Sequence, residues 1–464
     1  MTFSVNGKNT VVVGAGRSGV PAARLLRARG ANVTLADSAA TIDREAELQA
    51  AGVTVELGPH RADLLQRADL VVLSPGVDPE QPMFVSARRN GVPVIGELEL
   101  ASRWIKGRMV AITGTKGKST TTTLTARMLS EAGFDAPAGG NIGTALSGQV
   151  DASTADTVHV VETSSFQLEG TDAFHPWIAV LLNLSADHLD RHPTFDAYAD
   201  AKARIFRNQT EDDWAVVNLD DEGAASLARR AHPKSRRFDF ALDAEVNDGV
   251  TVEAGTIVRR ANGSASPLLP VGAVKIPGRH ILSDVLAATA VCCLAGVPPA
   301  AMQRAVETFQ GLEHALERVA VIGGVQFIND SKATNIAAAS RAIESFDRGV
   351  VVILGGKFKG GNFGDLAPLL AARADAVIAI GESRPQIHAA LDGVLPVEDA
   401  ASMADAVKQA AEKARTGGVV LLAPACASFD MFRDYADRGR QFKAAVESLR
   451  GLESAQFSVG PRRS

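Results

Sequence analysis

The chain has few cysteines, little net charge and no long apolar run. Its three cysteines among 464 residues form neither a disulfide framework nor a zinc-ligand spacing. A net charge of −5 gives no general attraction to nucleic acid or to an anionic membrane. No apolar stretch reaches the roughly 18 residues of a membrane span, and the amino terminus lacks a signal-peptide pattern. We therefore expect a cytoplasmic protein with no nucleic-acid partner and no membrane insertion.

One motif carries most of the chemical information. Residues 113–120 (TGTKGKST) join an apolar strand to a helix rich in Thr, Ala and Leu. Successive backbone N–H groups and the positive end of a helix dipole favour a phosphate, Lys118 can reach the outer phosphates, and the Ser119 hydroxyl can ligate Mg²⁺. Ile112 stands where a full Walker A motif has its first glycine. The predicted nucleotide-binding residues of this loop are Gly114, Thr115, Lys116, Gly117, Lys118, Ser119 and Thr120.

Length and alternation of segments predict an α/β protein of three domains. A chain of 464 residues is too long for one ordinary core, and strand-like runs alternate with helical ones, which is typical of parallel sheets covered by helices. The pattern restarts twice. We expect a Rossmann-like N-terminal domain (1–96), a central P-loop ATPase-type parallel-sheet domain (97–310) and a Rossmann-like C-terminal domain (311–464). The polar segment 236–270 predicts a small β excursion or a long connection.

A second glycine motif lies near the amino terminus. Residues 14–19 (GAGRSG) follow a strand, open a helix and precede Asp37 at the end of the next strand, which is the form of the dinucleotide fingerprint. Taken alone, this motif favours a NAD-dependent oxidoreductase over a Rossmann-like turn that binds another nucleotide. The phosphate loop favours the second interpretation. Residues 74–76 and Asn141 lie in loops that could bind a ligand or be ordinary turns.

Two side chains of the central block have the setting of catalytic groups. Glu162 ends an apolar strand in the same sheet as the phosphate loop, where a carboxylate could hold Mg²⁺; a solvated acid is the alternative. Lys202 shares one helical face with Phe195, Tyr198 and Phe206. Burial would lower its pKa, and a neutral amine can capture CO₂ as a carbamate. The alternative is a lysine whose ammonium reaches water along its stem.

Three loops of the last block follow strands. They span 329–335 (NDSKATN), 355–361 (GGKFKGG) and 424–430 (PACASFD). Asp330 or Ser331 could cap the following helix, which explains the acid but not the neighbouring lysine. Three such loops in one domain predict a binding face.

Taken in this order, the motifs resemble those of the Mur ligase family, and the match covers nearly the whole chain. The matching segments are the phosphate loop, 162–169 (ETSSFQLE), 187–191 (DHLDR), Lys202, 330–335 (DSKATN) and 424–430. The resemblance implies an ATP-dependent amide ligase of peptidoglycan precursor synthesis. Its implied substrates are ATP, UDP-N-acetylmuramoyl-L-alanine and D-glutamate. ATP would convert the carboxylate of the nucleotide substrate into an acyl phosphate, which D-glutamate then attacks. We expect the protein to be a monomer.

The resemblance also implies a role for individual residues. Lys118 would stabilise the transferring phosphoryl group, Ser119 and Glu162 would hold one Mg²⁺, and His188 with a carbamylated Lys202 would hold a second. Asp284 and Asp330 would join the phosphate loop in binding ATP. The implied UDP-sugar residues are Arg17, Ser18, Ser74, Gly76 and Asn141, and those around D-glutamate are Lys332, Thr334, Lys359, Ser428, Phe429 and Tyr435.

Three departures from the family pattern concern the ATP side. Ile281 and Asp284 replace two asparagines, Ala315 replaces an arginine, and Phe358 replaces a carboxylate. An arginine on phosphate makes a charge-assisted contact, so its loss could weaken ATP binding or turnover. These departures leave open a nucleotide-binding homologue with impaired turnover. A separate alternative is another ligase of this superfamily with a different acceptor, such as a folate polyglutamate chain.

Overall fold

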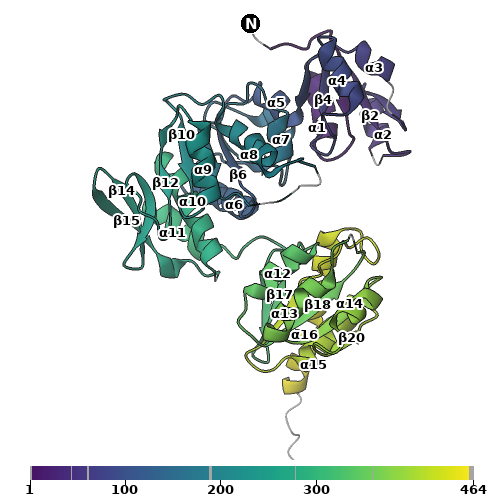
Figure 1. Ribbon diagram of the computed structural model, residues 1–464, viewed down its shortest axis with the longest axis vertical. Helices are drawn as coiled ribbons and strands as arrows, with labels where there is room; N and C mark the ends of the chain where they lie inside the picture. The colour runs from purple at the N-terminus through teal and green to yellow at the C-terminus, as the bar shows by residue number, and fades with distance from the viewer. Residues whose placement is uncertain are drawn as a thin grey trace, which may run out of the picture. The chain divides into compact units, whose positions relative to one another are not determined.

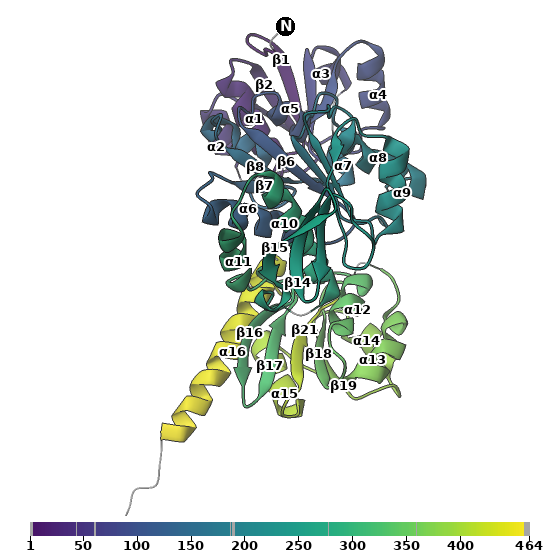
Figure 2. The ribbon, with the colours of Figure 1, turned by 90° about the vertical axis from the view of Figure 1, so that its left-hand side faces the viewer.

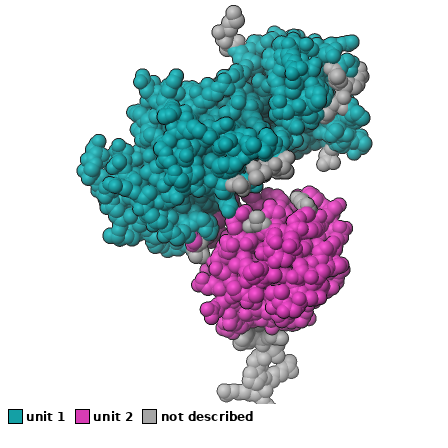
Figure 3. Space-filling view, viewed as in Figure 1, with its two compact units in different colours: residues 1–275, 279–309 teal, residues 276–278, 310–464 magenta. Residues whose placement is uncertain are grey.

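The computed structural model describes residues 3–42, 44–59, 62–185, 187, 191–276, 278–358 and 360–458. It divides into two compact units (Figure 3). Unit 1 comprises Met1–Lys275 and Arg279–Phe309, and unit 2 comprises Ile276–Gly278 and Gln310–Ser464. Within the described residues, no helix combines the length and apolar character that a bilayer crossing requires.

Unit 1 begins, in the purple part of the chain in Figure 1, with a parallel five-stranded sheet. Its strand order is β3-β2-β1-β4-β5. The central strand β1 (Asn9–Val13) is apolar from Val11 to Val13 because helices cover both faces: Val12 and Val11 lie in separate cores. From β1 the chain first adds β2 and β3 on one side of this strand and later adds β4 and β5 on its other side. Ligands of open α/β sheets bind at such a switch point. The remaining elements are α1 (Gly19–Ala28), β2 (Asn32–Asp37), α2 (Glu45–Ala50), β3 (Thr54–Leu57), α3 (Ala62–Gln66), β4 (Leu70–Leu73), α4 (Pro82–Arg89), β5 (Val94–Gly96) and α5 (Glu97–Ser102).

A parallel six-stranded sheet follows in the order β11-β10-β9-β6-β8-β7. Its strand β6 (Arg108–Thr113) leads through the phosphate loop into α6 (Lys118–Glu131). Helices α10 (Arg279–Leu294) and α11 (Pro299–Glu307) pack against α6 (Figure 2). The other elements are β7 (Ala138–Gly140), β8 (Val158–Glu162), α7 (Ser165–Glu169), β9 (Ile178–Leu181), α8 (Phe195–Ala203), β10 (Trp214–Val217), α9 (Glu222–Ala231) and β11 (Arg236–Arg237).

The polar segment after β10 forms a small separate sheet. Its order is β12-β13-β14-β15, with antiparallel pairing from β13 to β15, so the predicted β excursion is confirmed. The strands are β12 (Asp239–Phe240), β13 (Gly249–Glu253), β14 (Thr256–Ala261) and β15 (Ser264–Pro270).

Unit 2 is built on a third sheet, in the order β16-β17-β21-β18-β19-β20, with β16 antiparallel. Separate apolar cores again lie on its two faces, and the α/β class predicted from the sequence is confirmed for all three main sheets. The strands are β16 (Glu317–Ile322), β17 (Val325–Asn329), β18 (Val350–Gly355), β19 (Ala374–Ile380), β20 (Val397–Asp399) and β21 (Val419–Leu422). The helices are α12 (Ile336–Glu344), α13 (Ala367–Arg373), α14 (Arg384–Leu391), α15 (Met403–Lys413) and α16 (Tyr435–Ser458).

Candidate active site

A cavity of about 350 Å³ lies between loops of the first two sheets of unit 1. The loop after β1 approaches the loop after β4 closely, because Ser74 Oγ donates to the Gly14 carbonyl at 3.0 Å. A Cβ at Gly19 would lie 1.7 Å from that carbonyl oxygen, so only glycine fits there. The Arg17 guanidinium donates to the Asn141 carbonyl. The lining contains all five residues that the sequence assigned to the UDP-sugar: Arg17, Ser18, Ser74, Gly76 and Asn141.

The phosphate loop is fixed by Asn183, which follows β9. Its side-chain oxygen accepts from the backbone N–H groups of Thr115 (3.0 Å) and Lys116 (2.8 Å). Gly117, in the left-handed region with φ +80°, precedes the first turn of α6, where no side-chain cap is present. Lys118 Nζ donates to the carbonyls of Gly114 (3.0 Å) and Thr115 (2.9 Å). The loop therefore has the shape and the positive charge that suit a nucleotide phosphate.

Glu162 lies beside this loop, as the sequence predicted, because β8 pairs with β6 in register. One carboxylate oxygen accepts from Ser119 Oγ at 2.7 Å and the other from Asn141 Nδ2 at 2.7 Å. The carboxylate and hydroxyl oxygens are hard donors that suit Mg²⁺. In the part of the chain that the structure describes, no three His, Cys, Asp or Glu side chains gather as a metal site.

Lys202 is buried, with 1% of its surface exposed. Its Nζ donates to the Gly114 carbonyl at 2.7 Å and lies 4.7 Å from the centre of the Tyr198 ring. Burial, with a smaller contribution from the Lys118 charge, lowers the pKa of Lys202 to about 6. The apolar setting predicted from helical spacing is confirmed for this lysine, although Phe195 at the start of α8 is 41% exposed.

Asp284 packs against the phosphate loop from α10. A Cβ at Gly117 would lie 2.2 Å from its Oδ1, so the loop can approach α10 only with glycine at this position. Burial raises the pKa of Asp284 well above the ordinary value. In its protonated form this carboxyl can donate one hydrogen bond, as the asparagine amide of the family pattern would.

Three loops of unit 2 meet at one edge of its sheet, because β17, β21 and β18 are neighbours. The loops also bond to each other: Ala425 N donates to the Ala333 carbonyl, and Lys357 N to the Ala427 carbonyl, both at 2.9 Å. The structure thus gathers the three predicted loops. Of the D-glutamate residues assigned from the sequence, Ser428 is buried, Thr334 is half-buried, and Lys332, Phe429 and Tyr435 are exposed.

Arg438 was missed by the sequence reasoning, although it joins two of these loops. Its guanidinium is fully buried and donates to Ser331 Oγ (2.9 Å), the Ser331 carbonyl (2.9 Å) and the Cys426 carbonyl (3.1 Å). Its partners come from distant segments, and an arginine early in a polar helix gives no sequence signal of its own. The departure Phe358 has a packing role, since its ring stacks on Phe363 with centroids 4.6 Å apart.

The helix cap predicted at Asp330 or Ser331 is wrong. Helix α12 begins at Ile336, and its N-cap is Asn335, whose side chain accepts from the Ala338 N–H at 2.8 Å. Asp330 instead accepts from the Leu316 N–H at 3.2 Å, and burial raises its pKa to about 6. The predicted ligands His188 and Lys359 lie outside the described residues.

The raised pKa of Asp330 should make unfolding pH-dependent. Between about pH 4 and pH 6 the folded protein keeps a proton that the unfolded chain releases, so this carboxyl destabilises the fold as the pH rises through that window. The free energy of unfolding of Asp330→Asn, relative to that of the wild type, should therefore be higher at pH 7 than at pH 4 by on the order of 2 kcal/mol. Urea unfolding of both proteins at these two pH values measures the difference. Asp347→Asn, at an exposed aspartate of unit 2, is the control, and an equal difference at both pH values would contradict the prediction.

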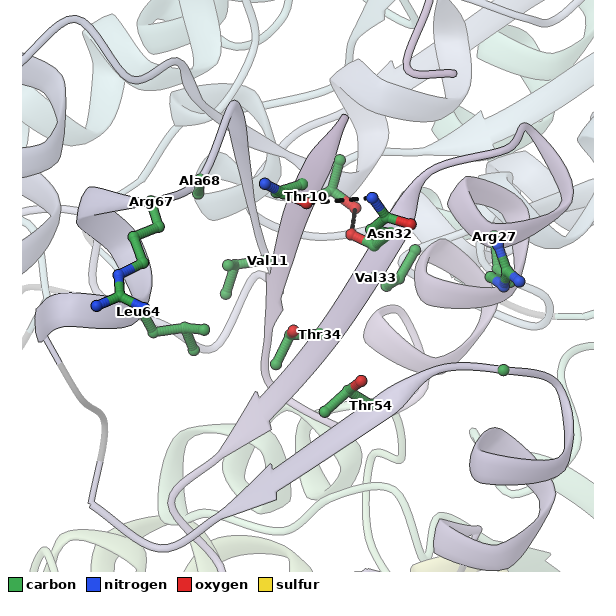
Figure 4. A pocket seen from close by; sticks show the side chains of 12 residues that line it. Thr10, Val11, Arg27, Asn32, Val33, Thr34, Thr54, Leu64, Arg67 and Ala68 are labelled. Carbon is green, nitrogen blue, oxygen red and sulfur yellow. Dashed lines mark hydrogen bonds between the residues drawn. The ribbon is translucent and has the colours of Figure 1, made fainter. Parts of the chain in front are cut away.

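A second cavity, of about 330 Å³, lies at the opposite ends of the first sheet's strands (Figure 4). It is lined by the beginnings of β1 and β2, with Arg27 and Arg67 among its residues. Asn32 Nδ2 donates to Asn9 Oδ1 at 3.2 Å within it. None of the residues assigned from the motifs lines this cavity, so it is separate from the candidate site.

Fold and site together define an α/β protein whose phosphate loop has a shape suited to a nucleotide phosphate. Three segments match one family: residues 8–96 match the Mur ligase MurD-like N-terminal domain, 112–292 the Mur ligase middle domain, and 314–426 the Mur ligase glutamate ligase domain. The chain belongs to the Mur ligase family.

Curated relatives are similar over almost the full length. A UDP-N-acetylmuramoylalanine–D-glutamate ligase of Acidobacterium capsulatum is 46% identical over 459 residues, covering 98% of this chain and 99% of the relative. One of the same name from Koribacter versatilis is 44% identical, with 96% and 99% covered.

Solved structures share the fold at lower identity. A UDP-N-acetylmuramate-alanine ligase from Thermotoga maritima gives a TM-score of 0.60 at 21% identity, covering 95% of this chain and 99% of that one. A pseudomurein peptide ligase type C from Methanothermus fervidus gives 0.58 at 17% identity, covering 96% and 100%.

Proposed function

We propose that this chain is an ATP-dependent ligase that joins D-glutamate to UDP-N-acetylmuramoyl-L-alanine in peptidoglycan precursor synthesis. The curated relatives carry the name of that reaction over nearly the whole chain. The observation that carries the proposal is the convergence of Lys118, Ser119 and Glu162 at the carboxyl ends of β6 and β8. We expect the enzyme to act as a monomer in the cytoplasm.

Each part of the chain has a proposed share in the reaction. Residues 1–96 would bind the UDP-sugar, with Asn141 completing the cavity, residues 97–310 would bind ATP, and residues 311–464 would bind the amino acid. When bound, ATP with Mg²⁺ supplies the phosphoryl group that converts the substrate carboxylate into an acyl phosphate, which the amine of D-glutamate attacks. The products are the amide, ADP and phosphate.

The residues of the chain stabilise charge and exclude water. Lys118 Nζ, which now donates to two loop carbonyls, would turn toward the transferring phosphoryl group, where a fixed cation lowers the barrier. Ser119 and Glu162 would hold one Mg²⁺. We propose that Lys202 is carbamylated, which converts a buried amine into an acid-like ligand, and that it holds a second Mg²⁺ with His188. The burial of Lys202 and its lowered pKa support this proposal, because CO₂ reacts with a neutral amine.

Phosphate release with each substrate omitted in turn tests the function. We expect release only when ATP, the muramoyl nucleotide and D-glutamate are all present. Release with a different acceptor would assign the chain to another reaction of the superfamily. ATP binding without release under any combination would indicate a homologue with impaired turnover, for which the loss of the arginine at Ala315 gives a physical reason.

A further inference from the structure

Histidine 192 has no role in the scheme above, yet it is more deeply buried than most polar side chains of unit 1. Its side chain is 1% exposed. Nε2 lies 2.9 Å from Ser165 Oγ, and Nδ1 lies 3.3 Å from a carboxylate oxygen of Glu169. Ser165 and Glu169 stand one helical turn apart on α7, so one imidazole is held at both ends by the same helix.

The same ring also contacts α8. It lies edge-on to Tyr198, with centroids 5.3 Å apart, and stacks on Phe166 at 5.4 Å. The Tyr198 hydroxyl lies 3.0 Å from Thr115 Oγ1 in the phosphate loop. His192 therefore sits between α7 and the residue of α8 that touches the phosphate loop.

The neighbouring Arg191 extends these contacts to the first sheet. Its guanidinium lies 5.0 Å from the Phe166 ring centre and donates to the Val77 carbonyl at 3.0 Å. Val77 lines the 350 Å³ cavity, and so does Gln167 of α7. Arg191 and His192 thus join two separate parts of the cavity lining, the loop after β4 and helix α7.

The contacts of His192 resemble those of a hydrolytic triad, because its imidazole lies between the Ser165 hydroxyl and the Glu169 carboxylate. The burial of these side chains argues against that role. A nucleophile must meet its substrate, and Ser165 is only 2% exposed while His192 is 1% exposed. The buried hydrogen bonds instead fix the orientation of α7 relative to the segment that carries His192.

We propose that Arg191 and His192 are positioning residues that fix the loop 74–77 relative to α7 and so set the shape of the nucleotide-sugar cavity. This inference rests on the proposed function, because it takes the muramoyl nucleotide as the occupant of that cavity. Without either side chain, the two parts of the lining lose their shared contact. Substrate binding must then order the cavity, and this ordering reduces the binding free energy. ATP should be little affected, because the phosphate loop keeps its contacts with Asn183.

The test is direct binding of UDP-N-acetylmuramoyl-L-alanine to the full chain by calorimetry, with a non-hydrolysable ATP analogue and Mg²⁺ present. His192→Gln and Arg191→Met should each weaken binding about tenfold, the effect of one or two lost hydrogen bonds. The dissociation constant of the ATP analogue alone should change less than about twofold. The double variant should lose less than the sum of the two single effects, because both side chains contact the Phe166 ring.

Two matched variants serve as controls. His175→Gln removes an imidazole that also bonds a carboxylate, Asp213 at 2.6 Å, but is 46% exposed. Arg207→Met removes an arginine that is 51% exposed. Neither should change binding. Thermal melting checks folding; if His192→Gln does not fold, the Arg191→Met variant decides, because the Arg191 side chain is 20% exposed and less deeply buried. Failure of the wild type to bind the muramoyl nucleotide would overturn both the proposed function and this inference, whereas wild-type binding with unchanged Arg191 and His192 variants would overturn the inference alone.

Discussion

Replacing Lys202 by alanine should abolish amide formation, and short carboxylic acids should partly restore it. If the lysine acts as a carbamate that holds Mg²⁺, the variant loses a metal ligand, and we expect activity below about 1% of the wild type. Acetate or propionate can enter the space left by the side chain and present two oxygens in its place. The measurement is the rate of phosphate release against acid concentration.

The same acids distinguish a missing carboxylate from general damage. They should not rescue Lys118→Met, in which the lost group is a cation rather than a metal ligand. A Lys202→Ala variant with wild-type activity would remove the carbamate from the scheme. A variant that is inactive with or without added acid would indicate that the lysine acts as an amine, through its hydrogen bond to the Gly114 carbonyl.

Lys118→Met should lower kcat by about 10²- to 10³-fold, the loss seen when one preorganised donor to a developing negative charge is removed. Methionine keeps most of the side-chain volume, so the loop should stay folded. Lys106→Met, at an exposed lysine ahead of β6, is the matched control and should leave kcat unchanged. Single-turnover phosphate release measures the effect, and a change confined to KM would show that Lys118 binds the ground state and the transition state equally.

The sequence predicted those parts of the site that depend on local chain geometry. A strand, a glycine loop and a helix in succession place Lys118 and Ser119, and parallel pairing brings Glu162 to the same sheet edge. The cavity residues Arg17 and Asn141 came from the resemblance, and their meeting follows from loops that leave neighbouring strand ends.

Other parts could not be predicted because they depend on tertiary contacts. Asp330, Ser331 and Asn335 are equally good capping residue types, and only the path of the chain selects Asn335. The link through Arg438 depends on residues far away in sequence. His192 follows a conspicuous polar run, and nothing in the sequence shows that its imidazole is enclosed by α7 and α8.

The strand order of unit 2 has a consequence for how the protein is made. Strand β21 is the last strand among the described residues, yet it lies between β17 and β18 in the middle of the sheet. A ribosome-bound chain that stops short of Val419 lacks the strand that joins the two halves, so β17 and β18 have no partner on their inner edges. Pairing across such sequence separation is slow. The loops proposed to hold the amino acid therefore assemble only after β21 has been made, and protease resistance of unit 2 in stalled chains should appear only once β21 has emerged.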